Sequence, residues 1–205
     1  SSDTASEVRY LPADQPNGRW RLVRKRRANI EYDVDHHGDR FYLRINDTGR
    51  NFRLVSVPIA NLTPEHWQEI VPHRTHVMLE DVDLFQHYRV LHERDQGLVQ
   101  LVITDLDSGD THRIAFDEPA YSLSGEDNWE WETHTFRYVY ESMTIPDTVY
   151  DYDMATREHI LHKRRPVLGD FDPAHYVTER RTAGAQDGTE IPVSLVYRKG
   201  TKLDG

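Results

Sequence analysis

Five residues in the first quarter of the chain have side chains of the types that bind metal ions. They are Asp33, Asp35, His36, His37 and Asp39. Zinc requires three or four ligands that converge on one point. In an extended strand neighbouring side chains point to opposite faces, so Asp35 and His36 would diverge. A solvated turn accounts for the same residues, and the sequence therefore predicts no metal site here.

A second histidine pair, His73 and His76, has the i, i+3 spacing that would place two ligands on one face of a helix. Pro72 lies directly before the pair, and the segments on either side are strand-like, so a loop is favoured. The sequence contains no cysteine, which excludes thiolate ligands and thiolate nucleophiles. We expect no metal-binding residue and no cofactor-binding residue in this chain.

A serine nucleophile deserves the same test, because twelve histidines and 35 acidic residues could supply its partners. Catalytic triads are defined by geometry and not by order along the chain. In α/β-hydrolases the nucleophile lies in a Gly-x-Ser-x-Gly turn between a strand and a helix. Ser108-Gly109 and Ser124-Gly125 lack the first glycine and that context. The sequence therefore predicts no catalytic residue.

Two short segments concentrate charge. Glu126–Glu132 is acidic and aromatic and could draw basic peptides toward a cleft. The simpler interpretation, which we favour, is an exposed loop whose tryptophans pack on the protein. Arg24–Arg27 is a basic run that could contact nucleic acid or form an inter-domain ion pair. A strand edge protected by charge is the favoured interpretation of this run.

The overall composition narrows the class of protein. The 205 residues carry a net charge of -10, with 37% hydrophobic and 29% charged residues. This acidity argues against nucleic acid or an anionic membrane as the main partner and suits a cationic peptide, although solubility alone also explains it. No apolar run reaches the roughly 18 residues of a membrane span. The absence of cysteine favours the cytoplasm.

The elements that position these side chains are predicted to be strands. Short runs rich in valine, isoleucine, tyrosine and leucine recur between turn residues, and three units of about 50 to 60 residues share one order of strands and turns. The units comprise Ile30–Asp35, Phe41–Ile45 and Phe52–Ile59; then Tyr88–Glu93, Leu98–Thr104 and Thr111–Phe116; then Phe136–Glu141, Thr148–Asp153 and Glu158–His162.

A four-stranded propeller blade needs one more strand per unit. The apolar patches Trp67–Val71, Val77–Leu79 and Tyr121–Leu123 could supply these strands. Glu7–Leu11 and Trp20–Arg24 resemble the closing strands of an earlier blade. The sequence thus predicts an all-β protein of about three four-stranded antiparallel blades. A β-sandwich is the competing architecture, but it would not require the longer repeat.

The turns carry further expectations. Gly49 and Gly109 are expected to adopt positive φ after type I turns. Arg157 occupies the same place in the third unit, so a differently closed turn is expected there. Thr63–Ile70 is the best helical segment, and its length allows one or two turns.

A boundary is predicted after Lys163, because the next ten residues hold two prolines and a glycine. We expect residues 1–163 to form the propeller portion, 164–175 a linker, and 176–205 the start of a second domain. Within the last part, Tyr176–Arg181 and Ile191–Arg198 are predicted strands. Asp187-Gly188 between them is a strong hairpin signal.

Two stretches resemble the oligopeptidase B type of the prolyl oligopeptidase family of serine peptidases. Glu141–Met154 is similar to the last propeller blade of that family, with its Ser-Met-Thr-x-Pro-x-Thr core. Ala185–Tyr197 resembles the first hairpin of its peptidase domain, although Gln186 replaces the usual arginine. Weaker similarities lie at Ile114–Tyr121 and around Trp67 to Glu80.

The resemblance implies a seven-bladed propeller that covers an α/β-hydrolase domain and an enzyme that cleaves short peptides after arginine or lysine. It also implies that this chain is an internal fragment, inactive alone, whose partners are short basic peptides, the remaining blades and the hydrolase domain. A free-standing β-propeller-like module that binds peptides or acts as a scaffold is the alternative.

Overall fold

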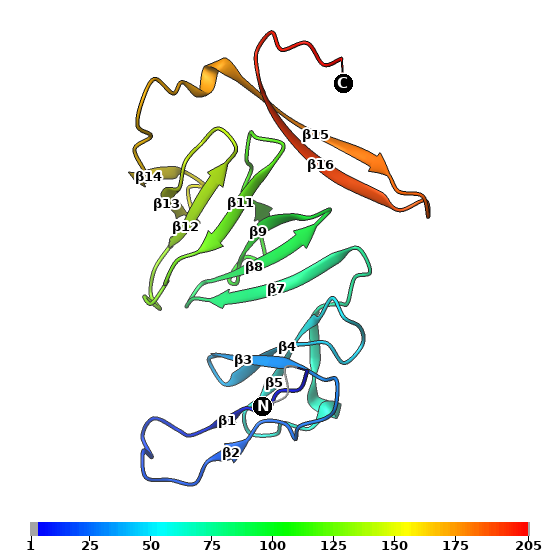
Figure 1. The fold of residues 1–205 in the computed structure, drawn as a ribbon. Coiled ribbons are helices and arrows are strands. Elements are labelled where there is room, and N and C mark those ends of the chain that lie inside the picture. Colours follow the sequence, from blue (N-terminus) through cyan, green and yellow to red (C-terminus); the bar gives the residue numbers. More distant parts are fainter. Residues whose placement is uncertain (1–3, 205) are drawn as a thin grey trace.

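The computed structural model describes residues 4–204, and their regular secondary structure consists almost entirely of antiparallel strands (Figure 1). A small N-terminal sheet pairs β1 (Arg9–Tyr10) with β2 (Arg21–Leu22). Single turns of 3-10 helix are formed by η1 (Pro64–His66) and η2 (Pro173–His175). No helix in residues 4–204 has the length and apolar character needed to cross a bilayer.

Three four-stranded sheets follow, which we call the first, second and third blades. The first blade contains β3 (Tyr32–His37), β4 (Arg40–Ile45), β5 (Arg53–Pro58) and β6 (Gln68–Val71). The second contains β7 (Val77–Leu84), β8 (Tyr88–Asp95), β9 (Leu98–Asp105) and β10 (Thr111–Arg113). The third contains β11 (Tyr121–Gly125), β12 (Thr135–Ser142), β13 (Thr148–Asp153) and β14 (His159–Arg164).

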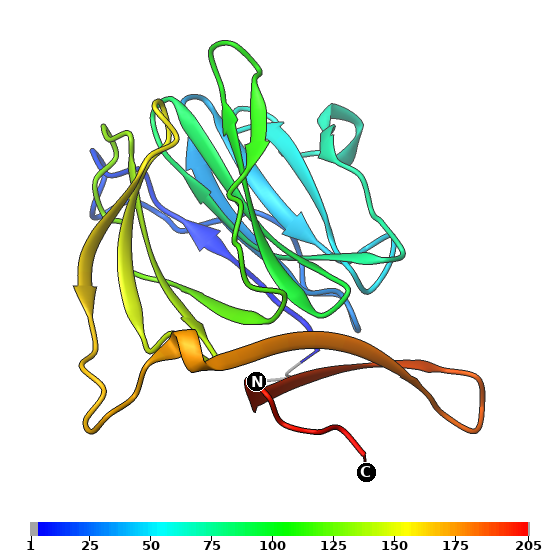
Figure 2. The same ribbon diagram turned by 90° about the horizontal axis from the view of Figure 1, so that it is seen from above.

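The strands of each blade pair in chain order, so every connection within a blade is a hairpin or a short loop. A separate two-stranded sheet, β15 (Tyr176–Gly184) and β16 (Glu190–Arg198), follows the third blade, and we call it the terminal hairpin. Figure 2 shows this hairpin running across one end of the blades. Gly188 has a φ of +83° in its turn, as the Asp-Gly signal predicts.

The hydrophobic cores lie between sheets. The core between the second and third blades contains Val90, Leu101, Phe136, Tyr138 and Tyr152, together with six further buried residues. A second core joins the first and second blades, and a third joins the N-terminal sheet to the first blade. Neighbouring side chains of one strand therefore enter different cores, as blades packed on both sides require.

The predicted blades are confirmed, since the strands of residues 4–204 form successive four-stranded sheets and not the alternative β-sandwich. The patches at Trp67–Val71, Val77–Leu79 and Tyr121–Leu123 supply β6, β7 and β11. The repeat was nevertheless out of phase. The first predicted unit contains the first three strands of its blade, whereas the other two units contain the last three strands of theirs. The fourth strand of the first blade, β6, was left out of its unit because it is short and follows a helical turn at η1. The predicted helical segment is thus one turn followed by a strand.

Two turn predictions were wrong. Gly49 does not have positive φ; it is needed for space, because a Cβ atom there would lie 2.2 Å from Nε2 of His73. Arg157, with φ of +66°, closes the same turn as Gly109, with φ of +78°. In both turns the closing amide donates to an aspartate carbonyl, at 2.9 Å for Gly109 and 2.8 Å for Arg157. The turn is therefore held by its hydrogen bonds even without glycine.

The core between the second and third blades predicts a large effect for Phe136, which is fully buried there. We expect Phe136→Ala to lower the free energy of unfolding by about 3–5 kcal/mol, because it opens a cavity between two sheets. Val139→Ala, on the other face of β12, is the control and should cost no more than about 1 kcal/mol. Urea unfolding measures both, and equal losses would contradict the assignment of the core.

Candidate functional site

The first strands of the first and second blades bring carboxylates close to one another. Asp33 and Asp35 lie on β3, Asp81 and Asp83 lie on β7, and the loop after β11 adds further acids. We call these residues the acidic rim: Asp33, Asp35, Asp81, Asp83, Glu126 and Asp127. The i, i+2 spacing on β3 and β7 places each aspartate pair on one face of its strand.

Four residues of the rim, Asp81, Asp83, Glu126 and Asp127, line an open cavity of about 420 Å³. It is lined by Asp81, Asp83, His92, Gly125, Glu126, Asp127, Asn128 and Trp129. His92 Nε2 lies 2.7 Å from Oδ2 of Asp83, within hydrogen-bonding distance. A Cβ on Gly125 would lie 3.5 Å from the His92 ring, which is ordinary contact. The cavity is therefore polar, predominantly acidic and open to solvent.

The carboxylates of the rim influence one another. Desolvation by the surrounding protein raises the pKa of Asp35 to about 6, although the residue keeps a solvent-exposed surface. The negative charges of Asp81 and Asp83 on the next blade, and then that of Asp33, add to this rise. Negative charge is thus concentrated where two blades meet, which is the arrangement that attracts cations.

The acidic and aromatic loop between β11 and β12 lies against this rim. The carbonyl of Trp131 accepts a hydrogen bond from the Gln86 amide at 3.0 Å, and its ring lies 5.1 Å from that of His37. Trp129 is 85% exposed. Our expectation that both tryptophans pack on the protein was therefore wrong for Trp129, because only the carbonyl and ring of Trp131 have partners on the first two blades.

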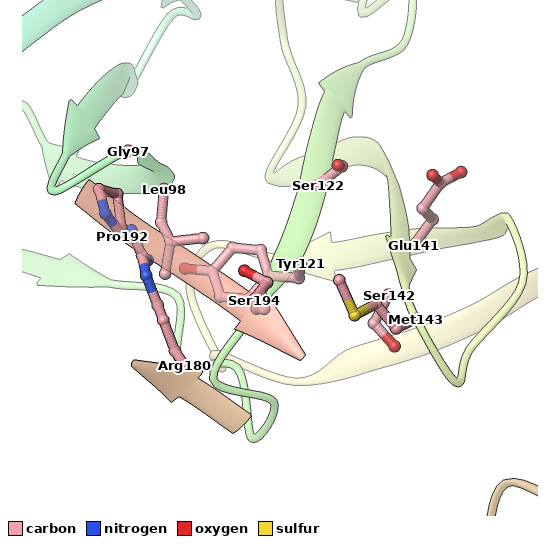
Figure 3. A pocket seen from close by; sticks show the side chains of 11 residues that line it. Gly97, Leu98, Tyr121, Ser122, Glu141, Ser142, Met143, Arg180, Pro192 and Ser194 are labelled. Carbon is pink, nitrogen blue, oxygen red and sulfur yellow. The ribbon is translucent and has the colours of Figure 1, made fainter. Parts of the chain in front are cut away.

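A second cavity, of about 460 Å³, separates the terminal hairpin from the second and third blades (Figure 3). We call it the hairpin groove. Leu98 from the start of β9, Tyr121 from β11 and Ser194 from β16 gather in it. Arg180 of β15 donates a hydrogen bond to the carbonyl of Gln96 and so ties the hairpin to the second blade.

The groove is polar at both ends. Tyr121 accepts a hydrogen bond from Nε2 of Gln100 at 2.9 Å. At the other end, a hydrogen bond shared with Asp147 raises the pKa of Glu141 above its ordinary value. The groove therefore offers the guanidinium of Arg180, the carboxyl group of Glu141 and several hydroxyl groups, which could bind a polar ligand or pack against another part of the protein.

The histidine and aspartate residues considered as metal ligands have other partners. Asp33 accepts a hydrogen bond from Arg44 at 2.5 Å, and Nε2 of His37 lies 3.0 Å from the Gln86 carbonyl. His73 lies in the loop before β7, as expected, and stands over Gly49. Within residues 4–204 no group of three or more histidine and acidic side chains is arranged to hold a metal ion.

Several histidines pair with aspartates, but in the described part of the chain none of these histidines forms a hydrogen bond with a serine hydroxyl. The pairs are His87–Asp107, His92–Asp83, His134–Asp153 and His175–Asp172. Serine hydroxyls bond instead to Arg40 and to nearby backbone or threonine groups. These histidines therefore serve as ion-pair and hydrogen-bond partners.

The basic run at Arg24–Arg27 has a structural partner. Arg24 lies 3.5 Å from Asp47 and stacks over the Trp67 ring at 5.0 Å. Burial opposes ionisation of Asp47, but hydrogen bonds and charge from Arg53 and Arg24 prevail and lower its pKa. Arg24 thus ties the N-terminal segment to the first blade.

Sequence reasoning missed Asp81 and Asp83. Their i, i+2 spacing on either side of the buried Val82 is a signal that could have identified them. Their proximity to Asp35 could not be predicted, because it depends on how two blades pack.

Blades that share an inner edge, with an open acidic rim, define this chain as part of a β-propeller. It belongs to the prolyl oligopeptidase family: residues 1–165 match the prolyl oligopeptidase N-terminal β-propeller domain. Oligopeptidase B from Leishmania major superposes over 100% of this chain and 30% of its own, with 28% identity and a TM-score of 0.87. Oligopeptidase B from Trypanosoma brucei, bound covalently to antipain, superposes over 99% of this chain and 30% of its own. The sequence identity is 29% and the TM-score is 0.88.

Dipeptidyl aminopeptidase BI from Pseudoxanthomonas mexicana is 40% identical over 100% of this chain. The chain spans 28% of the length of that relative. The family is therefore established for the propeller, and the activity of a whole protein is a separate question.

The raised pKa of Asp35 predicts pH-dependent stability. The folded protein holds this proton more tightly than the unfolded chain, whose aspartates titrate near pH 3.9, so stability falls as pH rises from about 4 to about 6. We expect Asp35→Asn to be more stable than the unmodified chain at pH 7.5, by up to about 1 kcal/mol because solvent screens the rim.

At pH 4 this advantage should disappear, since Asp35 is then largely protonated in the folded protein. Urea midpoints at the two pH values measure the difference. Asp39→Asn, in the exposed β3–β4 turn, is the control for loss of one negative charge. Lower stability of the Asp35 variant at pH 7.5 would refute the argument.

Proposed function

We propose that this chain is the propeller portion of a serine oligopeptidase that hydrolyses short peptides after arginine or lysine. The acidic rim carries the proposal, because it concentrates negative charge where a basic peptide would pass. The match to oligopeptidase B structures along the whole chain supports the same reading. The propeller would restrict access, so that short flexible peptides reach the triad and folded proteins do not.

We propose the same division of the chain that the sequence predicts. In this division the propeller comprises residues 1–163, a linker comprises residues 164–175, and the start of the hydrolase domain comprises residues 176–205. The family match that ends at residue 165 supports the first boundary. The terminal hairpin supports the second, since β15 and β16 pair only with each other in residues 4–204. The remaining blades and the catalytic triad would come from the rest of the protein, which we place in the cytoplasm.

A second candidate activity is dipeptidyl aminopeptidase action, favoured by one observation. The relative with that name shares more of its sequence with this chain than the oligopeptidase B structures do. Such an enzyme needs a free amino end on its substrate, whereas an oligopeptidase that reads only the basic residue does not. An acidic rim would attract the charged amino end as well as a basic side chain.

Four fluorogenic peptides separate the candidates. Their amino end is blocked or free, and the residue before the cleaved bond is arginine or leucine. We expect the complete protein to cleave both arginine peptides, a serine-directed phosphonate to abolish cleavage, and the 205-residue chain to cleave none. Cleavage only of peptides with a free amino end would favour the second candidate. Phosphonate-sensitive turnover by the 205-residue chain would overturn the proposal.

The role of the rim has its own test in the complete protein. We expect Asp81→Asn combined with Asp127→Asn to lower kcat/KM for the blocked arginine peptide about two- to tenfold at low ionic strength, because steering weakens. The effect should fade near 1 M salt, where the Debye length is about 3 Å.

The control pair, Glu158→Gln with Asp170→Asn, removes the same charge from exposed positions outside the rim. A matching loss in this pair, or a loss that persists at high salt, would exclude steering by the rim.

A further inference from the structure

A smaller cavity between the second and third blades has different walls. Its volume is about 210 Å³. It is lined by Ala115, Phe116, Asp117, Glu118, Tyr138, Tyr140, Ile145, Tyr150 and His159. We call it the aromatic pocket. Drug-sized ligand pockets measure about 300–1,000 Å³, so this one suits a group the size of a single side chain.

The strand register creates the aromatic walls. Tyr138 on β12 is paired with Tyr150 on β13, and Tyr140 follows two positions later on the same face of β12. Phe116, from the segment after β10, stacks on Tyr140 with centroids 5.2 Å apart and meets Tyr138 edge-on at 5.9 Å. His159 of β14 stands at 86° to Tyr150. Rings set at such angles present faces and edges in several directions around one space.

A carboxylate completes the lining. Oε1 of Glu118 accepts a hydrogen bond from Oγ1 of Thr144 at 2.5 Å. Oε2 of Glu118 is buried and has no hydrogen-bond donor among residues 4–204. A buried carboxylate oxygen without a donor is unfavourable, and such atoms call for a specific explanation. Asp117 beside it adds a second negative charge to the lining.

No cation of the described chain neutralises this pocket. Within residues 4–204 no lysine, arginine or histidine forms an ion pair with Glu118 or Asp117. Burial lowers the pKa of His159, and this effect is larger than the opposite effect of the negative charge of Asp117. The ring of His159 is therefore neutral at pH 7. Burial, and then the charge of Glu118, raises the pKa of Tyr140 to about 12, so this phenol also stays neutral.

We propose that the aromatic pocket binds an alkylammonium or guanidinium group, with Glu118 Oε2 accepting its hydrogen bond and the aromatic rings of the lining, Tyr150 among them, contacting the cation. Ring faces attract cations through their quadrupole, and the attraction grows when the site is desolvated. A donor on the cation satisfies the unpaired oxygen. The pocket is formed by the third blade and the segment between β10 and β11, and it shares no lining residue with the acidic rim, so the proposal does not depend on the peptidase assignment.

The test is isothermal titration calorimetry on the complete protein, treated beforehand with a serine-directed phosphonate to block a peptidase site. The probes are n-butylammonium and methylguanidinium, with n-butanol as a neutral probe of similar shape. We expect saturable binding of both cations with Kd near 1 mM and no binding of n-butanol.

Variants assign the binding to this pocket. We expect Glu118→Gln, which keeps the acceptor for Thr144, to weaken cation binding about tenfold, because it removes a charged hydrogen bond. Tyr150→Leu should weaken it about threefold or more. Glu158→Gln removes the same charge from an exposed position and should leave Kd unchanged. Circular dichroism confirms that each variant is folded.

Two results overturn the proposal: no saturable binding of either cation up to about 10 mM, or unchanged affinity in the folded Glu118 variant. A blocked tripeptide with a central lysine or arginine distinguishes the sources of the cation. Binding tighter than that of the free amine supports a peptide side chain as ligand, and equal or weaker binding supports a small free cation. Activity of the protein plays no part in these measurements, so failure here leaves the proposed peptidase function standing.

Discussion

The structure depends on one constraint: a four-stranded blade has two faces and can bury neither of them by itself. In β5, Leu54 enters the core shared with the second blade, while Val55 enters the core shared with the N-terminal sheet. The second blade is packed on both sides, and β9 is buried along most of its length. Burial of apolar area therefore stabilises pairs of neighbouring blades, and each blade requires the next.

The third blade shows the consequence of having only one neighbour within the described residues. The alternate residues Phe136, Tyr138 and Tyr140 of β12 are buried, while β14 is exposed along its whole length. Ile160 and Leu161 on β14 remain more than half exposed. In the protein that we propose, further blades and the hydrolase domain would cover surfaces of this kind.

Blade packing also decides the electrostatics. The acidic rim forms because the first strands of neighbouring blades meet at one edge, which brings the carboxylates of β3 and β7 together. The aromatic pocket forms on the third blade, where the segment between β10 and β11 brings Glu118 to the rings of β12, β13 and β14. One architecture thus holds two sites with affinity for cations, one open and wide, the other narrow and lined with rings.

The sequence by itself determined the strands, most of the hairpins and the number of blades, because alternation of apolar residues and turn chemistry are local properties. The sequence also predicted the Asp187-Gly188 turn and the apolar patches that form β6, β7 and β11. It could not determine that Arg157 would adopt positive φ or that Gly49 makes room for His73, since both depend on contacts made after folding.

The tertiary structure alone decided which residues meet. Asp35 lies in the field of Asp81 and Asp83, and Glu118 faces rings from three strands, across separations of up to about 50 residues. Strand register and blade packing set these distances, and a linear pattern does not encode them in any short window. Local chemistry therefore fixed the elements, and the burial of their two faces fixed the sites.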